Sequence, residues 1–132
     1  MAHQTVSGEW DRNLVPDHQG QTQRPDPGCP VEVALAAITG RWTTLVLRDL
    51  MHGPRSFGQL REGLPSLSDK VLADRLKHLV ARELVDRQVR RGFPTRSVYS
   101  LTAAGAQLRP LLIELYRTGQ RLQQQPPTAG AA

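Results

Sequence analysis

The sequence contains one cysteine, Cys29, and four histidines among its 132 residues. A single cysteine excludes a disulfide within the chain and a cysteine-rich metal site, and it suits a reducing compartment. The histidines are scattered, without the short spacings that metal ligands show. We therefore expect neither a bound metal nor a cofactor.

Long apolar runs and enzyme motifs are also missing. No segment is long and apolar enough to span a bilayer, and the first residues lack the basic and apolar regions of a secretory signal. The sequence has no phosphate-binding glycine loop, nucleophile elbow or pair of carboxylates at catalytic spacing. We expect a cytoplasmic protein that has no membrane association and is not an enzyme.

The chain carries a net charge of +5, unevenly distributed. Residues 1–28 have a net charge of −2, so the remainder carries +7, which favours an anionic partner. Both ends, 1–28 and 125–132, are polar and rich in glutamine, proline or glycine, which predicts disordered tails. Residues 29–124 are then expected to form the single domain for which a chain of this length has room.

Turn and cap residues divide this domain into helices. Pro30 at a first helical position and Gly40 after the last apolar residue predict the first helix. The second, over residues 41–52, is apolar on more than one face and should lie centrally. Ser56 and Gln59 form a capping-box pair for a short third helix.

A fourth helix is predicted by leucines at the i, i+4, i+7 spacing of a buried stripe. Either Ser66 or Ser68 can cap this helix. Arg55–Ser56, ahead of the third helix, is a candidate for a very short strand. The buried stripe consists of Leu72, Leu76 and Leu79.

The apolar period changes to two after the fourth helix. Residues 85–91 and 96–102 flank the turn 92–95, which predicts an antiparallel hairpin. The hairpin residues expected to face the core are Val85, Val89 and Val98, with Leu101 as a further candidate.

Four helices, a hairpin and a last helix in a small basic body predict a mainly α fold with a small β-hairpin, the winged helix-turn-helix. There the fourth helix lies in the major groove of DNA and the hairpin, or wing, follows the backbone or the minor groove. A merely solvated face would explain the helix alone, but an arginine-rich turn directly after it favours DNA. The candidate DNA contacts are Ser68, Lys70, Val71, Asp74, Arg75, Lys77 and His78 on the helix and Arg90, Arg91 and Arg96 on the wing.

A last helix should run from Ala103 to Gln124, capped by Thr102 and bent near its middle at Pro110. Its leucine stripe is longer than so small a body can cover, which predicts a homodimer, although packing on its own core is the alternative. A two-fold interface of the first and last helices would set two recognition helices about 34–36 Å apart on a near-palindromic operator. The expected interface residues are Val31, Leu35, Leu108, Leu111, Leu112, Leu115 and Leu122.

Several motifs in order resemble those of the HxlR-type winged helix regulators, whose architecture is related to that of the MarR-type regulators. The motifs, between Cys29 and about Gln120, are "CPV", "GRW", "LVLRDL", "GPRSFGQL", "LPSLSDKVLADRL" and "YSLTAAG". The resemblance implies a dimeric DNA-binding transcription factor, more often a repressor, with Ser68, Lys70 and Arg75 on its recognition helix and Arg96 on its wing. The family often has glycine where this chain has Glu83, which leaves that helix without its usual glycine cap.

Two residues are candidates for sensing an effector. Cys29 lies at the expected N-cap of the first helix, where the helix dipole favours a thiolate, and some members of the resembled family sense quinones, aldehydes or oxidants there. An ordinary buried thiol is the alternative. Trp42 is a candidate contact for a small molecule held between the first and last helices, or else a core residue. A winged helix module that binds an acidic protein partner is the alternative to DNA binding.

Overall fold

The computed structural model describes residues 11, 13–14, 24 and 26–126. The chain divides into two compact units, Met1–Val33 and Ala34–Ala132, and each is considered by itself. Most of the two expected tails, 1–28 and 125–132, lies outside the described residues, so the domain boundaries stay a prediction. No helix in the described part of the chain is long and apolar enough to cross a membrane.

The first four helices fall where the sequence predicts them. Two capping interactions explain why α3 and α4 begin where they do. Ser56 and Gln59 form the expected capping box, in which each side chain bonds the other's main-chain N–H, at 3.1 and 2.9 Å. Ser68, rather than Ser66, caps α4 by accepting from the Val71 N–H at 3.2 Å. The helices are α1 (Pro30–Ile38), α2 (Thr43–Leu50), α3 (Phe57–Gly63) and α4 (Asp69–Ala81).

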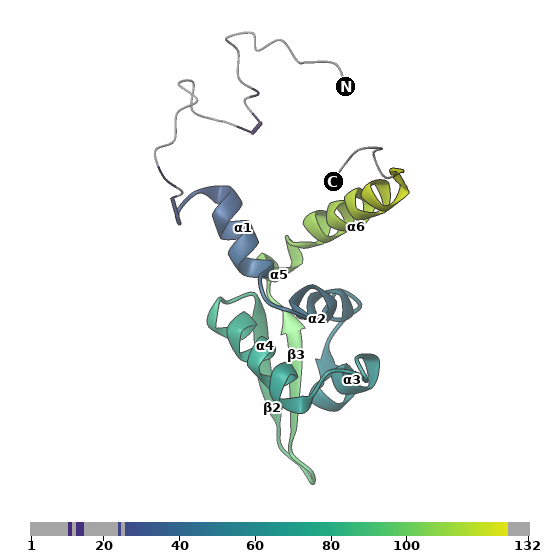
Figure 1. Cartoon of the computed structure of the whole chain (residues 1–132). Coiled ribbons are helices and arrows are strands. Elements are labelled where there is room, and N and C mark those ends of the chain that lie inside the picture. The colour runs from purple at the N-terminus through teal and green to yellow at the C-terminus, as the bar shows by residue number, and fades with distance from the viewer. Residues whose placement is uncertain (1–10, 12, 15–23, 25, 127–132) are drawn as a thin grey trace. The chain divides into compact units, whose positions relative to one another are not determined.

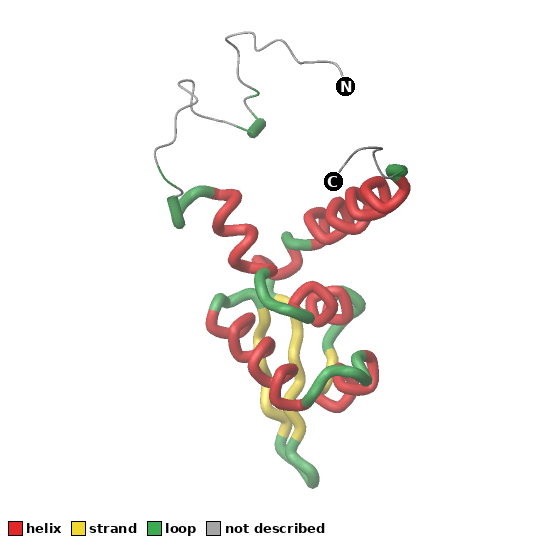
Figure 2. The backbone as a smooth tube through the Cα atoms, viewed as in Figure 1, coloured by secondary structure: helices red, strands yellow, loops and turns green. Residues whose placement is uncertain are grey.

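A three-stranded antiparallel sheet contains the wing (Figures 1 and 2). Its strands are β1 (Arg55–Ser56), β2 (Val85–Arg90) and β3 (Arg96–Leu101), in the order β1-β3-β2. The expected short strand is thus present and covers one edge of the hairpin. Figure 1 shows the tip of the β2–β3 hairpin projecting beyond α3 and α4.

The core lies between α2, α3, α4 and the inner end of the hairpin. Val46, Leu47 and Leu50 enter it from α2, and Leu60 from α3. The predicted stripe of α4 is buried throughout, because Leu72, Leu76 and Leu79 are each at most 1 % exposed. Burying each such leucine is worth about 1.5–3 kcal/mol.

The hairpin residues that face the core are partly different from those expected. Val85 is buried as predicted, but Val89 is 53 % exposed because it lies far out along β2, beyond the body that would cover it. Val98 is half-buried on the opposite face of the sheet, because strand residues alternate and it sits three positions from Leu101. Tyr99, only 8 % exposed, occupies the core position instead.

The last helix is two helices, α5 (Ala103–Ala106) and α6 (Arg109–Gln124). The expected bend at Pro110 in mid-helix is therefore wrong. Pro110 stands in the first turn of α6, where a missing N–H removes no helical hydrogen bond. Thr102 caps α5 as predicted, with its Oγ1 accepting from the Gly105 N–H at 3.1 Å.

The end of α4 has a main-chain cap despite lacking glycine. Glu83 adopts the left-handed conformation, with φ of 61°. Its N–H donates to the Val80 carbonyl at 2.9 Å, and the Leu84 N–H donates to the Leu79 carbonyl at 3.0 Å. These two bonds form a Schellman motif, in which glycine usually holds the position of Glu83. A glutamate there is strained by about 1–2 kcal/mol.

Candidate nucleic-acid interface

The outer face of α4 carries two unpaired lysines. Its leucine stripe is buried in the core, so Lys70 and Lys77 on the other side are exposed, and Ser68 at the N-cap is exposed with them. The two lysines are seven residues, nearly two turns, apart and share one side of the helix. Neither forms an ion pair with another described residue. This face can therefore offer two free ammonium groups to an anion.

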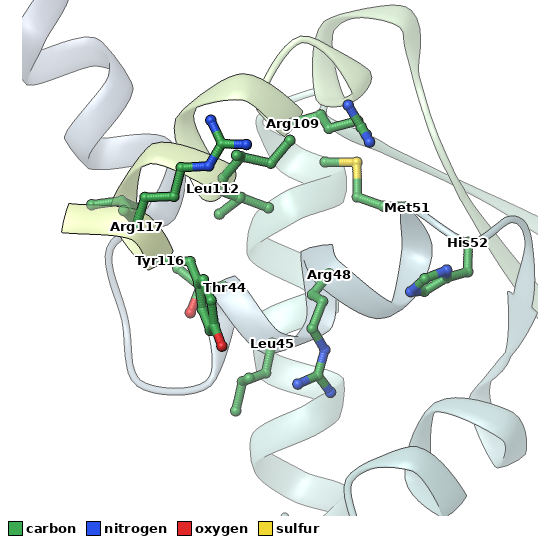
Figure 3. Close-up of a pocket in the computed structure, with 11 residues that line it drawn as sticks. Thr44, Leu45, Arg48, Met51, His52, Arg109, Leu112, Tyr116 and Arg117 are labelled. Atoms are coloured by element: carbon green, nitrogen blue, oxygen red, sulfur yellow. The ribbon is translucent and has the colours of Figure 1, made fainter. Parts of the chain in front are cut away.

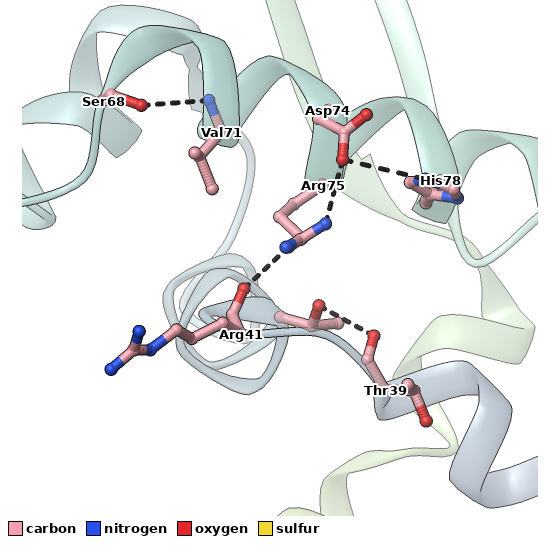
Figure 4. Close-up of polar contacts among 8 residues, drawn as sticks. Thr39, Arg41, Ser68, Val71, Asp74, Arg75 and His78 are labelled. Atoms are coloured by element: carbon pink, nitrogen blue, oxygen red, sulfur yellow. Dashed lines mark hydrogen bonds and ion pairs between the residues drawn. The ribbon is translucent and has the colours of Figure 1, made fainter.

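Arg75, in contrast, is engaged by its own chain (Figure 4). Its Nε donates to the Arg41 carbonyl oxygen at 2.7 Å, and its Nη1 lies 2.9 Å from Asp74 Oδ2. Only 24 % of its side chain is exposed. The guanidinium predicted to contact DNA thus joins α4 to the segment between α1 and α2.

Asp74, a second predicted DNA contact, is also committed within the chain. Its Oδ2 lies 2.9 Å from Arg75 Nη1 and 3.8 Å from His78 Nε2, and Figure 4 shows both pairings. Val71 is half-buried against the core, whereas His78 is largely exposed. The predicted residues on α4 therefore divide into an outward set, Ser68, Lys70, Lys77 and His78, and a set held by internal contacts.

The wing concentrates positive charge. The register sets Arg90 directly opposite Arg96, and Arg91 follows at the start of the turn. All three are exposed, and none has an ion-pair partner among the residues that the structure describes. Like charges directly opposite each other destabilise a strand pair, so an anion between them would be stabilising.

Sequence reasoning missed the residue at the tip of this turn. Phe93, between Gly92 and Pro94, has a fully exposed side chain. The signal was present in the sequence as an aromatic residue inside an arginine-rich turn, where no core can cover it.

A cavity of about 630 Å³ lies between α2 and α6 (Figure 3). Trp42 is not among its described lining residues. Trp42 instead precedes α2 with φ of 77° and packs, half-buried, against the core. Its place therefore fits the alternative, a core residue. The lining comprises Thr44, Leu45, Arg48, Met51, His52, Arg109, Leu112, Ile113, Leu115, Tyr116 and Arg117.

The residues expected at a dimer interface differ in exposure. Leu108 is 9 % exposed and belongs to the chain's own core, so it has little surface left for a partner. Leu111 and Leu112 are partly buried against that core. Large exposed fractions remain on the others: Val31 (61 %), Leu35 (48 %), Leu115 (44 %) and Leu122 (66 %).

Cys29 stands directly before α1, as predicted. Its carbonyl oxygen accepts the Val33 N–H at 2.9 Å, the first hydrogen bond of the helix. The thiol is free and half-buried. Within the described residues, no group of three or more histidine, cysteine, aspartate or glutamate side chains is arranged to hold a metal ion.

Comparison with known proteins identifies the class to which this fold and basic surface belong. The family model of the HxlR-like helix-turn-helix matches residues 37–126. The chain therefore belongs to the HxlR-like helix-turn-helix family. Its relatives are named as transcriptional regulators.

Among those relatives, an uncharacterized helix-turn-helix regulator of Synechocystis is 38 % identical over 91 residues, which cover 69 % of this chain and 67 % of the relative. The regulator YodB of Bacillus subtilis is 39 % identical over 88 residues, covering 66 % and 79 %. The solved reduced form of YodB superposes with a TM-score of 0.66 over 75 % of this chain and 98 % of that one, at 33 % identity. YodB has also been solved in diamide-treated and quinone-bound forms.

Proposed function

We propose that this protein is a repressor that binds a near-palindromic double-stranded DNA operator as a homodimer. The observation that carries the proposal is the exposed face of α4, where Lys70 and Lys77 project without partners among the described residues. In this proposal α4 lies in the major groove, with its N-terminal part toward the base edges.

The wing supports the same partner. Arg90, Arg91 and Arg96 would contact phosphates or the minor groove beside the site of α4. Figure 1 shows the beginning of α4 and the tip of the hairpin toward the same end of the structure, so one duplex can meet both. DNA would also relieve the repulsion between the opposed Arg90 and Arg96.

Exposed apolar side chains on α1 and α6 support dimerisation. Val31 and Leu35 on α1 and Leu115 and Leu122 on α6 are all at least 44 % exposed in the single chain. Covering such surface is favourable, and repeated exposure along a helix is typical of an interaction site. A two-fold pair would carry its recognition helices about 34–36 Å apart, one turn of DNA.

The test begins with selection of bound duplexes from a random-sequence library by the purified full-length protein. The selected DNA should contain inverted half-sites, and footprinting should protect two sites one helical turn apart. If about six to ten phosphates are neutralised, affinity should fall about 10³–10⁵-fold between about 50 and 200 mM salt. Equal affinity for selected and scrambled duplexes would contradict the proposal and favour an acidic protein partner.

Release from DNA is proposed to follow modification of Cys29 by an oxidant or electrophile. The half-buried thiol at the start of α1 supports this, because it is reachable and adjoins the positive end of the helix dipole. The diamide-treated and quinone-bound forms of the relative YodB support it further. The α2–α6 cavity is the candidate place for an effector that binds without covalent change.

A further inference from the structure

The tip of the wing presents an aromatic side chain entirely to water. Phe93 has a relative exposure of 108 %, the largest among the exposed large hydrophobic residues that the structure describes. Single exposed apolar residues are common on protein surfaces and need no explanation by themselves. Phe93 differs because of its position, at the outermost point of a hairpin that projects beyond the helices (Figure 1).

The side chains around Phe93 indicate which partner would cover it. Arg90 and Arg96 face each other at the base of the turn, and Arg91 leads into it. The apolar tip is therefore ringed by cations without ion-pair partners in the described part of the chain. A minor groove has the complementary arrangement, with phosphates along both walls and stacked bases at its floor.

We propose that Phe93 inserts as an apolar wedge between two base pairs in the minor groove beside each half-site and kinks the duplex there. This inference rests on the proposed function and extends it from backbone contact by the wing to deformation of the DNA. Phenylalanine is one of the residues that minor-groove proteins use as wedges, with kinks of about 20–90°. Pyrimidine–purine steps unstack most easily, so the kinked step should be TA or CA/TG.

The experiment uses the duplex selected by the full-length protein, labelled at its ends for energy transfer and carrying 2-aminopurine at the step nearest the wing. Wild type should bend this duplex and raise the 2-aminopurine fluorescence by unstacking it. Phe93→Ala should abolish the bend and the fluorescence change and weaken binding about 5- to 100-fold, the range expected for loss of one stacking contact. Because no phosphate contact is removed, the dependence of affinity on salt should stay unchanged.

Two further variants are the controls. Phe93→Trp should retain the bend, because it keeps an aromatic wedge. Val89→Ala removes an exposed apolar side chain elsewhere on the same hairpin and should bind and bend as wild type does. Since Phe93 touches no core, its variants should melt as wild type does.

The possible failures are distinguishable. If Phe93→Ala bends and binds the duplex like wild type, the wedge is overturned while the proposed regulator stands. The wedge is equally overturned if the variant binds more weakly but leaves bend and fluorescence intact, because Phe93 then contacts a backbone or a second copy. If wild type prefers no duplex, the wedge and the proposed function fail together.

Discussion

Arg75 Nε donates to the main-chain carbonyl oxygen of Arg41, 34 positions earlier in the sequence, at 2.7 Å. This bond ties the recognition helix α4 to the segment between α1 and α2, which Thr43 also holds by donating to the Thr39 carbonyl at 3.1 Å (Figure 4). A Cβ at Gly40 would lie 3.4 Å from Arg75 Nε, so the segment leaves little space beside the guanidinium. Arg75 thus orients α4 from behind.

Arg75→Met should lower the free energy of unfolding by about 1 kcal/mol, because it removes a charge-assisted hydrogen bond that is partly screened by solvent. Urea unfolding measures this loss. Lys70→Met, on the outer face of the same helix, should change stability by less than about 0.5 kcal/mol. A fully stable Arg75→Met whose salt dependence of DNA binding is reduced would instead identify Arg75 as a phosphate contact.

Lys70→Ala and Lys77→Ala should each weaken operator binding and flatten its salt dependence, because each removes a phosphate contact. The slope of log affinity against log salt should fall by about 1 for each lysine lost, hence by about 2 in a dimer. Titrations of the selected duplex at several salt concentrations measure the slope. Slopes identical to that of wild type would show that α4 does not meet phosphates through these residues.

Glu83→Gly should stabilise the protein by about 0.5–1 kcal/mol, because relief of left-handed strain exceeds the greater chain entropy of glycine. Thermal unfolding should show a higher Tm. Glu83→Ala is the matched control, since it removes the same carboxylate but keeps a Cβ at φ of 61°. Equal Tm values for the glycine and alanine variants would contradict the role assigned to strain.

Gly105→Ala should destabilise the fold by about 2 kcal/mol or more through overpacking. A Cβ at Gly105 would meet the Leu84 carbonyl oxygen, a main-chain atom, at 2.0 Å. Gly58→Ala is the control, because the nearest atom to its added Cβ is a side-chain oxygen at 4.0 Å. If both variants unfold at the same urea concentration, the close approach of α5 to Leu84 is not needed for stability.

Diamide should release the wild-type protein from its operator and leave Cys29→Ser bound. The serine variant retains a similar shape but has no thiol, and Cys29 is the only cysteine in the sequence. Gel-shift titration follows the release, and intact mass identifies the adduct or cross-link. Release of both proteins at the same diamide concentration would exclude Cys29 as the sensor.

Much of the fold could be predicted because its signals are local. The capping box of Ser56 and Gln59 requires only residues three apart, and the α4 stripe follows from helical periodicity alone. The change to a period of two located the hairpin by the same reasoning. The free lysines of α4 could also be predicted, because they lie opposite the buried leucines.

The remaining features depend on contacts between distant segments. The placement of Tyr99 rather than Val89 in the core follows from how far the body extends along the hairpin, and this is set by packing. Likewise the separation of α5 from α6 reflects the approach of Gly105 to Leu84.

The sequence by itself determined the order of the helices, the hairpin and the basic character of both predicted DNA-binding elements, because periodicity, capping and charge act over a few residues. Only the tertiary structure decided which of those charges stay free. Arg75 and Lys77 are alike in sequence terms, yet a carbonyl 34 positions away from Arg75 engages its guanidinium and leaves the outer face to the lysines.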